Sequence, residues 1–338
     1  MESGFLLCFA TFALLLPFFS FLAEAQGIGV NYGMKGDNLP SPSEVISLYK
    51  SRNITKLRLF FPDKEALDVL RGSGIGVILG AYNEDLPQLA ENASFATSWV
   101  NESVIPYATS VEFRYIDIGN ELIPGDSASY VLPAMRNVDA ALRNAGVAIP
   151  VTTAVSTEVL DTSYPPSQGA FSDDVSQVLT DIVGFLSAKE APLLVNVYPF
   201  FAYAGDPGEV RLDYALFTSG GVVVQDGSLG YSNLFDAMVD SVNAALERAG
   251  GGAVEVVVSE TGWPSAGGDA GATVDNASTY INNLVKHVKS KAGTPRFPGK
   301  EPEVYLFAMF NEDLKPAGTE RNFGMYYPDM SEVYHVSF

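Results

Sequence analysis

The stretch Tyr115-Ile116-Asp117-Ile118-Gly119-Asn120-Glu121 carries an apolar, strand-like run directly into a glutamate. A second stretch, Glu255-Val256-Val257-Val258-Ser259-Glu260-Thr261-Gly262-Trp263, repeats the arrangement further along the chain. A carboxylate beside a buried strand is costly unless chemistry or a pairing partner holds it there. Two such glutamates suit glycoside hydrolysis, in which one carboxyl protonates the leaving oxygen and the other attacks the sugar carbon. The alternative is that each glutamate is only the polar residue at which a strand reaches solvent.

Short apolar runs of the same kind recur along the chain, with helical stretches between them. Their β-branched character is typical of strands that are covered on both faces in a parallel sheet. Strand, helix and strand in succession give right-handed parallel crossovers, and eight such units close into a barrel. We therefore expect an α/β fold, a single (β/α)8 TIM barrel over residues 26–338. The eight strands are predicted at Ile28–Tyr32, Leu57–Phe61, Val77–Leu79, Tyr115–Ile118, Val151–Ala154, Leu193–Val197, Val256–Ser259 and Tyr305–Phe310.

The intervening helices are legible from their spacing. Apolar residues from Leu234 to Leu246 fall on one helical face, after Ser232-Asn233 as caps and before the stop at Gly250-Gly251-Gly252. The stretches from Ser43 to Tyr49 and from Ala277 to Val288 show the same pattern.

The N-terminus predicts a targeting segment. Residues 5–22 are almost wholly apolar, and Ala23-Glu24-Ala25 places small residues where a signal peptidase cleaves. We expect a signal peptide over residues 1–25 and delivery to the cell exterior rather than the vacuole, the alternative being an N-terminal membrane anchor. Asn-x-Ser/Thr sequons, consistent with secretion, occur at Asn53, Asn92, Asn101 and Asn276.

Charge and composition exclude several classes of function. Twenty Lys and Arg against forty Asp and Glu give a net charge of −20, which argues against nucleic acid or anionic membranes as partners. The only cysteine, Cys8, lies in the predicted signal peptide, and the only histidines are His287 and His335, so we expect no metal site and no Ser-His-Asp triad. The string Gly72-Ser73-Gly74-Ile75-Gly76 precedes a strand, unlike a nucleotide-binding loop, and we expect no cofactor.

The chain resembles the plant glucan endo-1,3-β-glucosidases of glycoside hydrolase family 17 over essentially its whole mature length. Several long motifs carry the resemblance. They are Ile28-Gly29-Val30-Asn31-Tyr32-Gly33, Lys56-Leu57-Arg58-Leu59-Phe60, Gly119-Asn120-Glu121, Leu132-Pro133-Ala134-Met135-Arg136-Asn137, Asn196-Val197-Tyr198-Pro199-Phe200-Phe201-Ala202-Tyr203, the stretch from Ser259 to Ser265, and Phe307-Ala308-Met309-Phe310-Asn311-Glu312.

The resemblance implies that Glu121, at the end of the fourth strand, is the acid/base, and that Glu260, at the end of the seventh, is the nucleophile. It also places Glu312, Lys315 and Glu320 at supporting polar positions. The chain departs from many relatives at two positions, with Asn31 in place of Cys and Phe60 in place of Tyr.

Further residues are candidates for the site from their place near the strand ends. Asn120 could hydrogen-bond the sugar 2-hydroxyl, Tyr198 could donate to Glu260, and Arg58 could help to keep that carboxylate ionised; ordinary barrel packing is the alternative for all three. Asn196, in the same motif as Tyr198, is included as a supporting residue. Five aromatic residues are candidates to stack on sugar faces: Tyr32, Phe201, Tyr203, Trp263 and Phe310.

The function we expect is retaining endo-hydrolysis of 1,3-β-linked glucan, such as callose or fungal wall glucan, by a secreted monomer without a membrane anchor, in plant defence or wall metabolism. Retention requires carboxyl groups about 5–5.5 Å apart. The alternatives are a 1,3;1,4-β-glucanase acting on mixed-linkage glucan and a catalytically silent glucan-binding protein.

Overall fold

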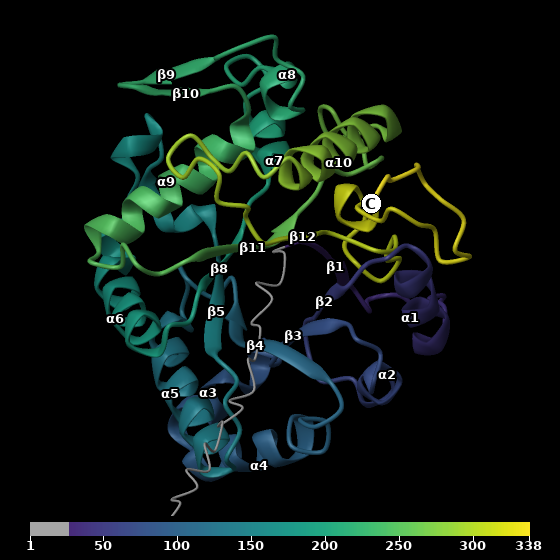
Figure 1. The fold of residues 1–338 in the computed structure, drawn as a ribbon, viewed down its shortest axis with the longest axis vertical. Coiled ribbons are helices and arrows are strands. Elements are labelled where there is room, and N and C mark those ends of the chain that lie inside the picture. Colours follow the sequence, from purple (N-terminus) through teal and green to yellow (C-terminus); the bar gives the residue numbers. More distant parts are fainter. Residues whose placement is uncertain (1–26) are drawn as a thin grey trace, which may run out of the picture.

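The computed structural model describes residues 27–338, so the predicted signal peptide lies outside the described residues. Eight parallel strands form a closed barrel, which confirms the predicted fold class (Figure 1). In spatial order the strands are β1 (Ile28–Tyr32), β12 (Val304–Leu306), β11 (Val256–Thr261), β8 (Leu193–Asn196), β5 (Val151–Ser156), β4 (Glu112–Asn120), β3 (Gly76–Gly80) and β2 (Lys56–Leu59). The carboxyl ends of parallel strands meet at one end of a barrel, here called the mouth, and this brings residues 120–121 and 260–261 together.

The alternation of residues along β2 shows how the barrel is filled. Leu57 and Leu59 belong to the large apolar core that the helices cover, whereas Lys56 and Arg58 are buried on the other face of the strand. A separate apolar cluster draws single residues from five barrel strands: Ile78, Ala154, Leu194, Val257 and Tyr305. The barrel interior therefore has an apolar layer, with polar side chains above it toward the mouth.

Helices cover the outside of the barrel (Figure 1). Several begin at polar caps, as at Asn233, whose side chain accepts from the backbone N–H of Asp236. The outer helices are α1 (Pro42–Ser51), α2 (Lys64–Leu70), α3 (Leu86–Glu91), α4 (Ala93–Ser103), α5 (Ala128–Asn144), α6 (Asp173–Lys189), α9 (Leu234–Arg248) and α10 (Val274–Lys289). Within residues 27–338 none of the helices is both long and apolar enough to span a bilayer.

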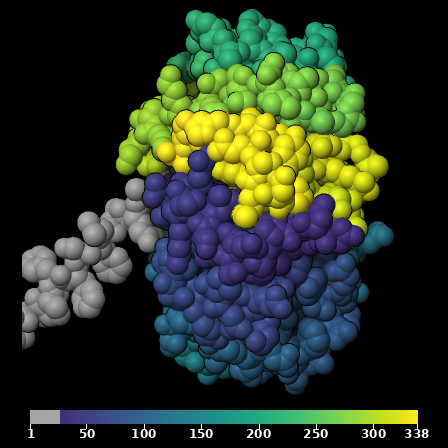
Figure 2. Space-filling view, turned by 90° about the vertical axis from the view of Figure 1, so that its right-hand side faces the viewer, coloured from purple at the N-terminus to yellow at the C-terminus, as the bar shows by residue number. Residues whose placement is uncertain are grey.

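Two excursions after barrel strands were not predicted from the sequence. An antiparallel pair follows β5, formed by β6 (Leu160–Thr162) and β7 (Ala170–Phe171). A larger excursion follows β8 and contains α7 (Pro199–Gly205), α8 (Leu212–Ala215), β9 (Val224–Asp226) and β10 (Leu229–Tyr231). After β12 the described chain contains only the short 3-10 helix η4 (Thr319–Arg321) and no α-helix. This C-terminal segment lies against the first elements of the chain (Figure 2).

The two strands that carry the glutamates are both irregular near their ends. The register of β4 against β5 shifts between Asp117 and Asn120, and the register of β11 against β8 shifts between Val258 and Glu260. A bulge of this kind redirects the side chains that follow it. Gly119, with φ 90°, lies inside the first irregularity, in a backbone conformation that L side chains rarely adopt.

Candidate active site

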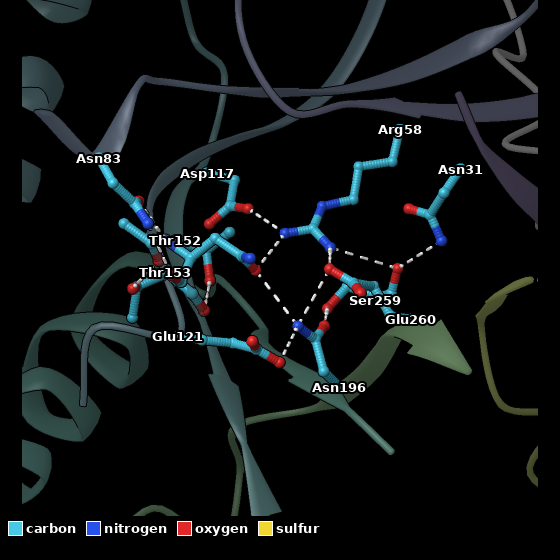
Figure 3. Close-up of polar contacts among 12 residues, drawn as sticks. Asn31, Arg58, Asn83, Asp117, Glu121, Thr152, Thr153, Asn196, Ser259 and Glu260 are labelled. Carbon is cyan, nitrogen blue, oxygen red and sulfur yellow. Dashed lines mark hydrogen bonds and ion pairs between the residues drawn. The ribbon is translucent and has the colours of Figure 1, made fainter. Parts of the chain in front are cut away.

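Glu121 and Glu260 face each other at the mouth, and one side chain bridges them (Figure 3). The amide nitrogen Nδ2 of Asn196, at the end of β8, donates to Oε1 of Glu121 at 2.8 Å and to Oε1 of Glu260 at 3.0 Å. The sum of these two distances, 5.8 Å, is the largest separation that the two carboxylate oxygens can have. Carboxyls this close can act on a single glycosidic bond from its two sides.

Glu260 is buried and takes hydrogen bonds on both oxygens. Nη1 of Arg58 donates to Oε1 at 2.6 Å, and the hydroxyl of Tyr198 donates to Oε2 at 2.7 Å. Arg58 is fully buried, and burial alone would lower its pKa, but the carboxylates of Asp117 and Glu260 raise it. Its positive charge therefore compensates the negative charge of Glu260 where water does not reach.

The second amino group of Arg58 binds the neighbouring strand. Nη2 donates to Oδ2 of Asp117 at 2.7 Å and to Oδ1 of Asn120 at 2.8 Å. Burial raises the pKa of Asp117, although the charge of Arg58 opposes the shift. Arg58 is thus held in one orientation by carboxylates from β4 and β11, the two strands that carry the glutamates.

Glu121 lies at the mouth in an unusual backbone conformation. Its φ is 54°, in the left-handed region that a non-glycine residue rarely adopts, and its N–H donates to the carbonyl of Ala154 at 2.9 Å. Desolvation raises the pKa of Glu121, and the charge of nearby Glu260 raises it further, while Asn196 and Arg58 oppose the shift. A carboxyl with a raised pKa keeps its proton to higher pH and is suited to act as a general acid.

Asn120 is fixed from both sides. Its backbone N–H and carbonyl pair with the side chain of Asn83, at 2.9 Å each, and its Oδ1 accepts from Arg58 and, at 3.2 Å, from Asn196. With Oδ1 taken by two donors, the amide N–H groups of Asn120 are left for a substrate hydroxyl.

The five predicted aromatic residues separate into two groups. Tyr32, Trp263 and Phe310 are buried, and the indole N–H of Trp263 is used by the carbonyl of Gly271 at 2.9 Å. A ring without an open face cannot stack on a sugar, so the predicted stacking role is wrong for these three, which pack the core instead. Phe201, 46% exposed, and the half-buried Tyr203 lie on α7 next to the end of β8, where a sugar can reach them.

Glu312, Lys315 and Glu320 lie together after β12. The ammonium of Lys315 is 3.6 Å from Glu312 and 3.9 Å from Glu320, and it lies 4.2 Å from the centre of the Phe307 ring. That ring packs edge-on against Tyr198, so these residues are one ring away from the group that binds Glu260. Their described ion pairs do not include Glu121 or Glu260.

Asp117, Asn83 and Ser259 contribute to the site but were not predicted from the sequence. Ser259 donates from Oγ to Oδ1 of Asn196 at 2.8 Å and so orients the bridging amide. The sequence did indicate a role for Asp117, because a carboxylate within an apolar strand, two residues before Gly119, needs a buried partner. Asn31 and Phe60, the two departures, support Arg58 and its surroundings: Asn31 donates to the carbonyl of Ser259 at 3.1 Å, and the guanidinium carbon of Arg58 lies 4.6 Å from the Phe60 ring centre.

Comparisons with known proteins identify the family of the chain. Residues 28–338 match the model of a family described as glycosyl hydrolases family 17. A glucan endo-1,3-beta-glucosidase of Vitis vinifera is 54% identical over 321 residues, covering 93% of this chain and 92% of that protein. The glucan endo-1,3-beta-glucosidase of Nicotiana tabacum named basic vacuolar isoform GLB is 50% identical over 323 residues. That match covers 94% of this chain and 86% of the Nicotiana protein. A solved structure from a study of two plant beta-glucan endohydrolases with distinct substrate specificities is similar with a TM-score of 0.88 and 45% identity, covering 92% of this chain and all of that one.

Proposed function

Because the chain belongs to the glycosyl hydrolases of family 17, we propose that it hydrolyses internal 1,3-β-glucosidic bonds of glucan with retention of configuration. The observation that carries the proposal is the Asn196 amide, which binds both carboxyls and limits their nearest oxygens to a separation of at most 5.8 Å. Retaining enzymes place their carboxyls about 5–5.5 Å apart, whereas inverting enzymes need roughly 6.5–9.5 Å to admit a water. The spacing here favours direct attack on the sugar.

The two glutamates would then have different roles. Glu260, with its charge compensated by Arg58 and its second oxygen oriented by Tyr198, attacks the anomeric carbon. Glu121, whose pKa is raised, protonates the departing oxygen. Once the glycosyl-enzyme ester has formed, Glu260 carries no charge, the pKa of Glu121 falls, and Glu121 accepts a proton from the attacking water. Asn120 binds the 2-hydroxyl of the reacting sugar through its free amide N–H groups.

Linear 1,3-β-glucan is the proposed substrate because the relatives from Vitis and Nicotiana carry that activity in their names. Mixed-linkage 1,3;1,4-β-glucan is the second candidate, since one similar structure comes from a pair of plant endohydrolases whose specificities differ. Reducing-sugar release from laminarin beside cereal mixed-linkage glucan separates the two. Proton NMR of the first products tests the mechanism: we expect the β-anomer first, and an initial α-anomer would contradict retention. A protein that binds laminarin without cleaving it would be the silent alternative.

The setting of the reaction is also part of the proposal. We propose a monomer that loses residues 1–25 and acts outside the cell on callose or fungal wall glucan, in defence or wall metabolism. The apolar N-terminal segment and the exposed sequons at Asn53 and Asn101 support the secretory route. Mass spectrometry of the protein from its native tissue tests the secretory route, because it identifies the mature N-terminus and the glycans. Fractionation of the tissue into apoplast and vacuole tests the destination.

A further inference from the structure

An aromatic pair at the mouth has no part in the site described above. Phe61 follows β2, and Tyr82 follows β3, directly before Asn83. Their rings stack with centroids 4.6 Å apart and an angle of 14° between the planes. Tyr82 is 44% exposed, and Phe61 is half-buried. Phe61 therefore covers one face of the Tyr82 ring. The exposed area of Tyr82 lies on the other face and the edge of its ring.

The pair is connected to the catalytic strand through the residue that follows Tyr82. The side chain of Asn83 makes two hydrogen bonds of 2.9 Å with the backbone of Asn120, which precedes the acid Glu121. The loop after β3 is thus fixed against the end of β4, and the aromatic pair is held at the rim of the mouth.

The strand order places this pair across the barrel from the other exposed aromatic residues of the site. Phe201 and Tyr203 follow β8, which lies four positions from β2 and three positions from β3 in the closed ring of eight strands. Figure 1 shows α7 and β2 on different sides of the barrel. A glucan chain that crosses the mouth over Glu121 and Glu260 can therefore contact one pair of aromatic residues on one side of the two glutamates and the other pair on the other side.

Polar groups around Tyr82 match a neutral, hydroxyl-rich ligand. The pKa of Tyr82 is raised, first by burial and then by the charges of Asp63, Asp85 and Glu84. Carboxylates near an aromatic face accept hydrogen bonds from sugar hydroxyls, and together with the acidic chain they repel anionic ligands.

We propose that Phe61 and Tyr82 form a remote glucose-binding subsite, in which Tyr82 stacks on a sugar of the bound glucan several units from the bond that is cleaved. The inference rests on the proposed glucanase function and adds to it a preference for long chains. A glucan reaches Tyr82 only when it extends beyond the acids on that side, so the contact contributes to long substrates and not to short ones. Phe61 contributes indirectly, because it holds the Tyr82 ring in place.

The test compares Tyr82→Ala with the unaltered enzyme on laminari-oligosaccharides from the triose to the heptaose and on laminarin. Tyr327→Ala is the matched control, since Tyr327 is also 44% exposed but lies in the C-terminal segment. We expect about a tenfold loss of kcat/KM on laminariheptaose, as for the loss of one aromatic contact, with little change on the shortest cleaved oligosaccharide. We also expect the heptaose to be cut at different bonds by Tyr82→Ala, and Tyr82→Phe to restore the original pattern.

Each outcome decides the proposal. An equal loss on all chain lengths, an unchanged product pattern, or a similar effect of Tyr327→Ala would overturn the remote subsite while leaving the glucanase function intact. Absence of laminarin cleavage by the unaltered enzyme would overturn the proposed function and the subsite with it. Because Tyr82 is exposed, a matching melting temperature of Tyr82→Ala would show that a kinetic loss is not unfolding.

Discussion

Removing one hydroxyl from Tyr198 tests whether Glu260 is the nucleophile that the site holds in place. The hydroxyl is 2.7 Å from Oε2 of Glu260, whereas the donors Arg58 and Asn196 both bind Oε1. Tyr198→Phe keeps the ring, which packs against Phe307 and Phe323. Hydrogen bonds to charged groups contribute about 1.5–3 kcal/mol. At 1.36 kcal/mol per tenfold, the loss of this one corresponds to roughly a 10- to 150-fold lower kcat/KM.

The assay is steady-state hydrolysis of laminarin and of an activated aryl glycoside. We expect kcat to fall on both substrates with KM nearly unchanged, because the hydroxyl orients the attacking carboxylate and does not touch the sugar chain. Tyr280→Phe is the matched control: Tyr280 is a buried tyrosine whose hydroxyl pairs with Thr261, the neighbour of Glu260. A Tyr198→Phe enzyme with unaltered kcat, or a loss no larger than that of Tyr280→Phe, would refute the reasoning.

Three further predictions concern the two glutamates and the irregular end of β4. Glu121→Gln should remove the basic limb of the pH–rate profile. In the proposed mechanism activity needs a protonated Glu121 and falls as the pH rises through the raised pKa of this residue. A basic limb that remains in the variant would belong to another group. Glu260→Ala should nearly abolish turnover while azide restores cleavage with formation of an α-glycosyl azide; near-normal hydrolysis would remove Glu260 from its role. Gly119→Ala should lower the free energy of unfolding, measured by urea titration, by about 1–3 kcal/mol, because the φ of residue 119 is 90°. The control is Gly184→Ala, at an exposed position in a helix, and it should leave the free energy of unfolding unchanged or raise it. Equal effects of the two alanines would show that the bulge is not strained.

The barrel and the glutamate pair were predictable because both depend on local patterns. Eight apolar runs separated by amphipathic stretches specify parallel strands with helical crossovers, and a closed sheet brings their carboxyl ends together whatever the loops contain. Strand bounds were less accurate. The strand predicted at Tyr115–Ile118 extends from Glu112 to Asn120, because pairing with its neighbours, and not hydropathy alone, decides where a strand ends.

The bulges and the roles of the aromatic residues depend on contacts between distant parts of the chain. Nothing local to Trp263 indicates that it is fully buried against Phe200 and Tyr280, because an aromatic residue after a strand suits both a core and a sugar-binding surface. Tyr82 was overlooked for the same reason. Its exposure and its stacking on Phe61 arise from two loops that follow different strands.

Asp117 offers a reason why Arg58 could serve Glu260 in the proposed mechanism, in which the charge of Glu260 disappears during the reaction. In the resting site the buried guanidinium lies between two carboxylates, 2.7 Å from Asp117 and 2.6 Å from Glu260. When Glu260 becomes an ester in the proposed mechanism, its negative charge is lost, and an arginine paired only with Glu260 would be left as an uncompensated buried charge. Breaking a buried pair in this way costs about 3–5 kcal/mol. A glycosyl-enzyme in which Asp117 keeps its bond to Arg58 would not carry that cost. In the proposed mechanism, the carboxylate that the sequence did not reveal would therefore allow a fully buried arginine to support a temporary charge.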